Sequence, residues 1–79
     1  MGYYMKSMTQ NQIILHHLEK YGSITTFQAY DLYGITRLSA RIKEIRNMGY
    51  TIVSCRLKAV NRYGKKIGYC KYTLMIELL

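Results

Sequence analysis

Apolar residues recur at helical spacing in the first quarter of the chain. Ile14, Leu18 and Tyr21 stand at positions i, i+4 and i+7, which places them on one face of a helix. Thr9, followed three residues later by a glutamine, has the spacing of a capping box, in which each side chain binds a free backbone amide. The pattern therefore predicts a helix over residues 10–21.

A second, shorter helix is predicted directly after a β-prone connector. Residues 23–25 read Ser-Ile-Thr and suit a small edge strand. Thr25 repeats the capping-box spacing and opens a helix over residues 26–33, which a glycine follows. Ala29 and Leu32, three residues apart, are its predicted buried positions.

A third helix is predicted to begin after a turn of only three residues. Thr36 suits its N-cap, and Leu38, Ile42 and Ile45 form its predicted buried stripe. We expect this helix within residues 36–48. Two short helices joined by a short glycine-containing turn have the spacing of a helix-turn-helix.

The last part of the chain alternates in a way that predicts a β-hairpin. Residues 50–60 and 67–74 are rich in β-branched and aromatic types, and the turn NRYGKK at 61–66 contains glycine. We expect a register that puts the most apolar side chains on one buried face. That register pairs Val53 with Leu74, Cys55 with Tyr72 and Leu57 with Cys70.

Charge is unevenly distributed over the 79 residues, whose formal net charge is +8. Residues 1–36 carry equal numbers of basic and acidic side chains, whereas residues 37–76 carry ten basic side chains against Glu44 alone. A basic half joined to a neutral half predicts one side that faces a polyanion, most simply nucleic acid.

Several classes of protein and site are disfavoured. No apolar run is long enough for a transmembrane helix and the N-terminal stretch does not resemble a signal peptide, so we expect a cytoplasmic protein with its two cysteines as thiols. His16 and His17 are adjacent and lie about 100° apart on a helix, without a companion cluster of ligands, which disfavours a metal site. The four carboxylates are scattered and no phosphate-binding glycine loop is present, so we expect neither an enzyme nor a cofactor.

The outward face of the third helix follows from its buried stripe. Small residues come first on this face and its flanks, which suits a helix in the major groove. The predicted outward residues are Thr36, Ala40, Lys43 and Asn47, with Arg37 and Glu44 on one flank and Ser39 and Arg46 on the other. A cation at the start of a helix is unfavourable by about 0.3–1 kcal/mol. We expect a DNA phosphate to compensate for Arg37; the alternative is an ion pair with Asp31 or another carboxylate. We expect Arg41 to be mainly structural and to bridge the second and third helices through Asp31, with a phosphate contact as its second role.

The chain resembles a known family in its most specific stretches. The run ITRLSARIKEIRNMGY, with NRYG at hairpin distance and a closing KYTL, is similar to small winged helix-turn-helix domains of bacteriophages and prophages. The resemblance covers roughly residues 9–74 and implies an α+β fold of three helices followed by a two-stranded wing. It maps a recognition helix onto residues 36–48 and the wing onto residues 61–66.

The resemblance implies duplex-DNA binding by a transcriptional regulator or accessory factor. The wing side chains implied in contact with the minor groove or backbone are Arg62, Lys65 and Lys66. Tyr63 is a further predicted DNA contact on the wing; stacking of its ring on an unpaired RNA base is the alternative. Another alternative is a phage-encoded inhibitor or adaptor that binds a bacterial protein, because tyrosine is enriched both in protein interfaces and in this chain.

The two ends of the chain lie outside the predicted core. We expect residues 1–79 to form one domain with a core at 9–74 and tails at 1–8 and 75–79. Apolar tail residues predict either a homodimer or folding back onto the same domain; they are Tyr3, Tyr4, Met5, Met75, Ile76, Leu78 and Leu79.

Overall fold

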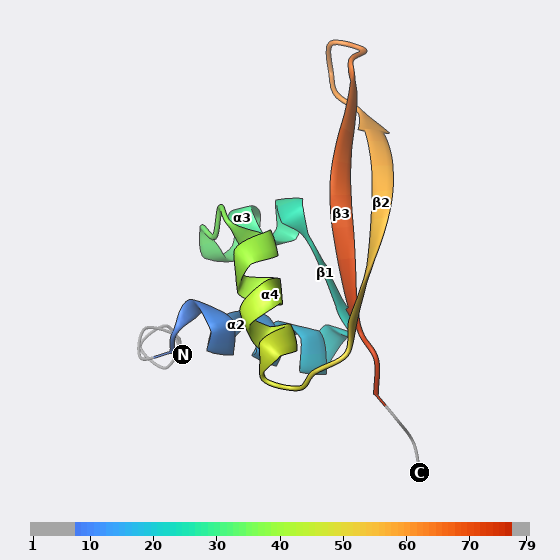
Figure 1. The fold of residues 1–79 in the computed structure, drawn as a ribbon. Helices are drawn as coiled ribbons and strands as arrows, with labels where there is room; N and C mark the ends of the chain where they lie inside the picture. Colours follow the sequence, from blue (N-terminus) through green and yellow to red (C-terminus); the bar gives the residue numbers. More distant parts are fainter. Residues whose placement is uncertain (1–7, 77–79) are drawn as a thin grey trace.

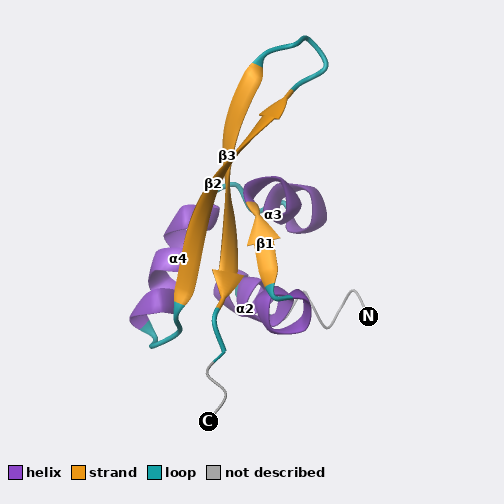
Figure 2. Ribbon diagram, turned by 90° about the vertical axis from the view of Figure 1, so that its right-hand side faces the viewer, coloured by secondary structure: helices purple, strands orange, loops and turns teal. Residues whose placement is uncertain are grey.

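Three helices lie on one side of a small antiparallel sheet (Figures 1 and 2). The computed structural model describes residues 8–76. Its elements, in chain order, are α2 (Gln10–Tyr21), β1 (Ser23–Thr25), α3 (Thr26–Tyr33), α4 (Leu38–Asn47), β2 (Ile52–Val60) and β3 (Lys66–Leu74). The α+β winged helix-turn-helix order is therefore confirmed. The expected connector strand β1 adds a third strand, so the sheet order is β1-β3-β2.

The first two helices begin and end as the sequence predicts. Thr9 and Thr25 each accept a hydrogen bond from the third backbone amide of the helix that follows. In return, the side-chain oxygen of the glutamine at that position accepts a hydrogen bond from the backbone amide of the threonine. Gly22 and Gly34 close these helices at φ +88° and +68°, values that favour glycine. These local signals fix both helices before any tertiary contact is considered.

The start of α4 differs from the prediction. Arg37, not Thr36, is its N-cap, and no side chain within residues 8–76 caps this end. The preceding turn explains the shift: the amides of Gly34 and Ile35 bond to Tyr30 O and Ala29 O and so extend the end of α3. Ile35 is buried in that turn. The helix therefore begins at Leu38, two residues after the start of the expected range 36–48.

The core lies between the three helices and the lower part of the sheet. Its buried members are Ile14, Leu18, Ile24, Ala29, Ile35, Leu38, Ile42, Ile45, Ile52 and Tyr72. The predicted burial of Leu32 is wrong, since this residue is 56% exposed, and Tyr21, on the same helix face as Ile14 and Leu18, is 63% exposed. On α3, Tyr33 packs against the core in place of Leu32, because it lies one full turn after Ala29.

The hairpin register is shifted by one residue from the prediction. The structure pairs Ile52 with Leu74, Ser54 with Tyr72 and Arg56 with Cys70. Val53 is consequently 48% exposed, whereas Ile52 and Tyr72 enter the core. The prediction assumed that one whole face is buried, but the hairpin extends beyond the helices (Figure 1), so the far part of the core-side face tolerates polar side chains.

The shifted register also separates the two cysteines. Cys55 stands opposite Lys71 and Cys70 opposite Arg56, on different faces of the hairpin. Both are free thiols, as expected. Cys70 packs against the core as a small apolar residue, whereas Cys55 is exposed.

Candidate nucleic-acid interface

The buried stripe of α4 determines which side chains the helix presents outward. Leu38, Ile42 and Ile45 are at most 2% exposed, so the phase of the helix is fixed. Lys43 and Asn47 are exposed on the opposite face. The remaining predicted positions are placed as follows: Thr36, Arg37 and Ser39 are exposed, and Ala40 is half-buried.

The cation at the start of α4 has no carboxylate partner within residues 8–76. In this part of the chain the one ion pair joins Arg41 and Glu44, so the alternative in which Arg37 pairs with Asp31 or another carboxylate is not observed. The uncapped start of the helix also leaves the backbone amides of the first turn without a side-chain acceptor. Arg37 and these amides together suit an anion from outside the chain.

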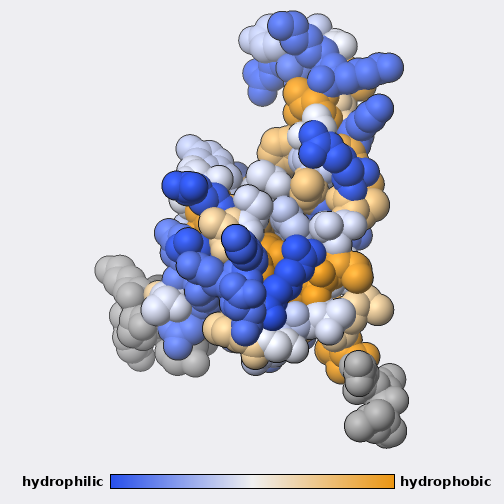
Figure 3. Space-filling view, viewed as in Figure 1, coloured by the Kyte–Doolittle hydropathy of each residue, from blue (hydrophilic) through white to orange (hydrophobic). Residues whose placement is uncertain are grey.

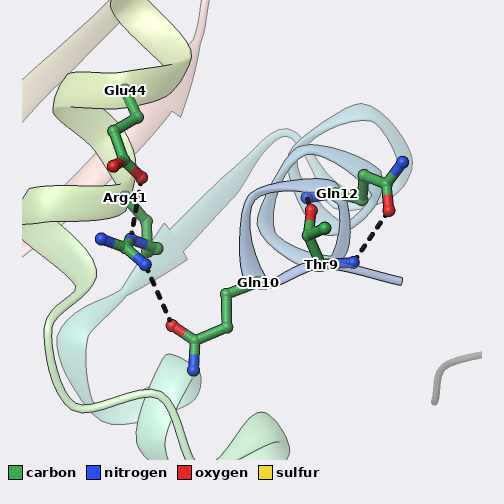
Figure 4. A network of polar contacts seen from close by, with 5 residues as sticks. All are labelled: Thr9, Gln10, Gln12, Arg41 and Glu44. Carbon is green, nitrogen blue, oxygen red and sulfur yellow. Dashed lines mark hydrogen bonds and ion pairs between the residues drawn. The ribbon is translucent and has the colours of Figure 1, made fainter. Parts of the chain in front are cut away.

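Arg41 is structural, but through partners other than the predicted Asp31. Its Nε lies 3.1 Å from Glu44 Oε1, and its Nη1 donates to Gln10 Oε1 at 3.5 Å (Figure 4). Arg41 thus bridges α4 to the start of α2 rather than to α3. Its guanidinium is already engaged, which distinguishes it from Lys43 and Asn47.

Arg46 ties the end of α4 to the hairpin. Its Nε and Nη2 both donate to Ile52 O, at 2.9 and 2.6 Å. The contact joins the last turn of the helix to the first residue of β2 and so fixes where the hairpin leaves the core. Sequence periodicity placed Arg46 on an outward flank and missed this role, because its acceptor is a backbone carbonyl.

The wing loop is shaped by Asn61. Its Oδ1 accepts from the amides of Tyr63 and Lys65 at 2.9 and 3.0 Å, and its own amide donates to Lys65 O at 2.9 Å. Gly64 completes the turn at φ +81°. The result holds the predicted wing side chains outward; Arg62, Tyr63, Lys65 and Lys66 are all exposed, Tyr63 at 83%.

The helix and the wing expose hydrophilic side chains on one face of the molecule. In the space-filling view hydrophilic surface covers α4 and the far end of the hairpin, with surface of mixed hydropathy between them (Figure 3). The hairpin rises beyond the helices (Figure 1), so the two regions lie at a distance from each other. Such spacing suits one extended polyanion better than a small anionic ligand.

His17 belongs to a buried polar contact that the sequence did not indicate. Its Nδ1 lies 2.7 Å from the Tyr33 hydroxyl, and its ring lies against that of Tyr21 at 4.7 Å. Burial is the main cause that lowers the pKa of His17, so the neutral ring is favoured. A cleft of about 410 Å³ borders these side chains. Across residues 8–76, no three histidine, cysteine or carboxylate side chains are grouped as a metal would require.

No helix in the described part of the chain is long and apolar enough to cross a membrane.

Comparison with known proteins agrees with the fold. The model of a family described as "winged helix-turn-helix domain" matches residues 9–77. No curated protein and no solved structure matches the chain. Because the family match extends over most of the sequence and the structure has the corresponding order of helices and strands, the chain belongs to the winged helix-turn-helix domain family.

Proposed function

We propose that this protein binds duplex DNA, with α4 in the major groove and the wing on the adjacent minor groove or backbone. The observation that carries the proposal is that the basic side chains of α4's outward face and of the wing loop are exposed and form no ion pair within residues 8–76. A winged helix-turn-helix domain suggests DNA binding, and a basic surface that spans two elements supports it. The role is one of binding rather than catalysis.

The proposed contacts divide into two groups. On α4 and the turn before it, Lys43 and Asn47 suit base edges or phosphates, whereas Arg37 suits a phosphate. Smaller side chains allow the helix to approach closely: Thr36, Ser39 and Ala40. On the wing, the contacts are Arg62, Tyr63, Lys65 and Lys66.

A competition experiment tests the duplex against the RNA alternative. Labelled random duplex DNA is bound first, and unlabelled duplex DNA or single-stranded RNA of the same length is added. The proposal predicts that duplex DNA displaces the label at lower concentration. Stronger displacement by RNA would instead assign Tyr63 to stacking on unpaired bases.

Lys43 and Asn47 are predicted to determine sequence preference. Their replacement by alanine should leave the melting temperature nearly unchanged, because both side chains are exposed, but removal of a good base contact costs about 1–3 kcal/mol at the affected position. Binding-site selection with wild type and the double variant measures this. Identical selected sites and affinities would contradict the assigned outward face.

The proposed biological role is that of a phage-type transcriptional regulator or accessory DNA-binding factor. Its place of action would be the compartment that holds the DNA, the host cytoplasm if a phage encodes it. The resemblance to phage and prophage domains supports this role. Genomic DNA fragments that the immobilised protein retains can be sequenced. Their positions show whether the binding sites cluster at promoters.

One observation favours a protein partner as a second candidate. Apolar and aromatic side chains are exposed around α3, on the half of the chain without net charge; they are Tyr21, Phe27, Tyr30 and Leu32. Surfaces of this kind are typical of protein interfaces. A pull-down from bacterial lysate with and without nuclease separates the two functions, since a direct protein partner survives removal of nucleic acid.

We also propose a homodimer that involves the C-terminal segment. Met75 and Ile76 are exposed after β3; the other expected tail residues lie outside the described residues, namely Tyr3, Tyr4, Met5, Leu78 and Leu79. Pairing would let two recognition helices contact two half-sites. Sedimentation should give a dimer for the full chain and a monomer for Met75→Ser/Ile76→Ser. A full chain that is monomeric at high micromolar concentration contradicts the proposal.

A further inference from the structure

The core-side face of the hairpin continues as a basic surface beyond the core. Ile52 and Tyr72 mark this face, because both are buried among the helices. Since side chains alternate along a strand, the same face of β2 carries Arg56 and Lys58 farther out. Lys66 of β3 lies on it as well, opposite Val60. We call this the inner face; at the base of the hairpin it is the side on which α2 and α4 lie (Figures 1 and 2), whereas the Tyr69 ring of the opposite face lies 4.9 Å from that of Phe27 in α3.

The outer face of the same hairpin has a different chemistry. Leu57 pairs with Tyr69 and Ala59 with Ile67, and all four side chains are half-buried. Lys71, opposite Cys55, is the one basic side chain of β2 and β3 on this face. Charge on the two strands is therefore gathered on the inner face, the face nearer to α4, rather than spread for solubility.

The Arg56 guanidinium lies over Gly68, which has no side chain. A Cβ at position 68 would lie 3.4 Å from Arg56 Nη2, 3.6 Å from Nε and 3.8 Å from Cζ. The guanidinium thus lies across the neighbouring strand, over the glycine. A side chain longer than a methyl group would take the space that the guanidinium occupies.

The backbone does not require glycine at position 68. Gly68 is not among the glycines with positive φ, which are Gly22, Gly34, Gly49 and Gly64. Glycine inside a strand weakens it and often marks a place where another group approaches closely. The room that it leaves for Arg56 is therefore the feature that accounts for glycine here.

The Arg56 guanidinium forms no ion pair within residues 8–76. In the same part of the chain it forms no side-chain hydrogen bond to a carboxylate, and the residue is exposed. A flat guanidinium with free donors matches the paired oxygens of a phosphate. Lys58 and Lys66 add positive charge along the same face.

From this geometry we infer that Arg56 and Lys58 form a second phosphate-binding row that continues from Lys66 of the wing down the inner face of the hairpin, and that Gly68 is its positioning residue. The row would bind the DNA backbone that runs beside the groove entered by α4, because it lies on α4's side of the sheet. The inference rests on the proposed DNA binding. It extends the interface from the wing tip down the strands of the hairpin.

The test compares inner-face and outer-face charges on one hairpin. Affinity for random duplex DNA is measured against salt concentration for wild type, Arg56→Ala, Lys58→Ala and Lys71→Ala. Each inner-face variant should lower the slope of log affinity against log salt by about 0.9, the value for one phosphate contact. Lys71→Ala removes the same charge from the outer face of β3 and should leave the slope unchanged.

The positioning role of Gly68 needs its own variants. Gly68→Val introduces a residue that favours strands, but its side chain fills the place of the guanidinium. It should therefore weaken DNA binding severalfold. It should have no further effect when combined with Arg56→Ala, because the two changes act on one contact. Gly68→Ala makes only ordinary contact with Arg56 and should bind as wild type does.

The outcomes separate this inference from the proposed function. Steep salt dependence in wild type, with equal slopes for Arg56→Ala and Lys71→Ala, overturns the second row and leaves DNA binding intact. An additive effect of Gly68→Val in the Arg56→Ala background overturns the positioning role. Wild type without salt-dependent binding overturns both. The comparison of Arg56→Ala with Lys71→Ala remains decisive if Gly68→Val fails to fold.

Discussion

Ile42→Ala is expected to unfold the domain or to lower its melting temperature by roughly 10 °C or more. Ile42 is completely buried at the middle of α4, among Leu38, Ile45 and the other core residues. Truncation of such a side chain costs about 2–5 kcal/mol, and each kcal/mol shifts the melting temperature of a domain this small by about 4–8 °C. Thermal unfolding followed by circular dichroism measures the change.

The matched control for this variant is the next residue along α4. Lys43→Ala removes an exposed side chain and should leave the melting temperature within a few degrees of wild type. At its upper end, the destabilisation expected for Ile42→Ala equals the lower end of the stability of typical domains, which is about 5–15 kcal/mol. Equal melting temperatures for the two variants would mean that the phase of α4 is wrong, and with it the assignment of its outward side chains.

Replacing Arg62, Lys65 and Lys66 together by alanine is expected to weaken binding to all DNA sequences alike. These side chains are exposed on the wing, and a contact to phosphate carries no sequence information. The slope of log affinity against log salt should flatten by about one unit for each phosphate that the variant no longer neutralises. Titrations of a selected site and of random DNA at several salt concentrations measure both effects.

The fold itself should survive this triple substitution. The loop is held by Asn61 and by backbone bonds at Lys65, none of which uses the three substituted side chains. An unchanged melting temperature is therefore the control. Unchanged slopes in a folded variant would show that the wing loop does not contact DNA.

The parts of the fold that the sequence predicts correctly rest on local contacts. The boundaries of α2 and α3 follow from threonine and glutamine side chains that bond within one turn and from glycines at positive φ. The buried stripe of α4 follows from side chains three and four residues apart. These signals need no knowledge of the rest of the molecule.

The errors arise where distant parts of the chain decide the outcome. The hairpin register depends on how far the helices cover the sheet, so Arg56 and Lys58 share a face with buried Tyr72. The shift at the start of α4 depends on the burial of Ile35. The basic side chains of the wing loop could be predicted from the sequence, because a turn is a local feature. The inner face of the strands could not be predicted, because it depends on the register.

The partners of long side chains were also beyond the reach of helical periodicity. Arg41 reaches Gln10 and Glu44 rather than Asp31, and Arg46 reaches the carbonyl of Ile52. Periodicity gives the direction in which a side chain leaves the helix, but a flexible guanidinium ends several bonds away. The structure thus separates the arginines of α4 that hold the fold from Arg37, which has no ion-pair partner within residues 8–76.

Salt titration of wild-type binding to a random DNA duplex tests the central claim most directly. If α4 and the wing bind the DNA backbone, log affinity should fall linearly with log salt, with a slope of about 0.9 for each phosphate neutralised. At least three wing contacts and one at Arg37 predict a slope steeper than about 3. Absence of measurable binding at low salt, or affinity independent of salt, would contradict DNA binding by this protein.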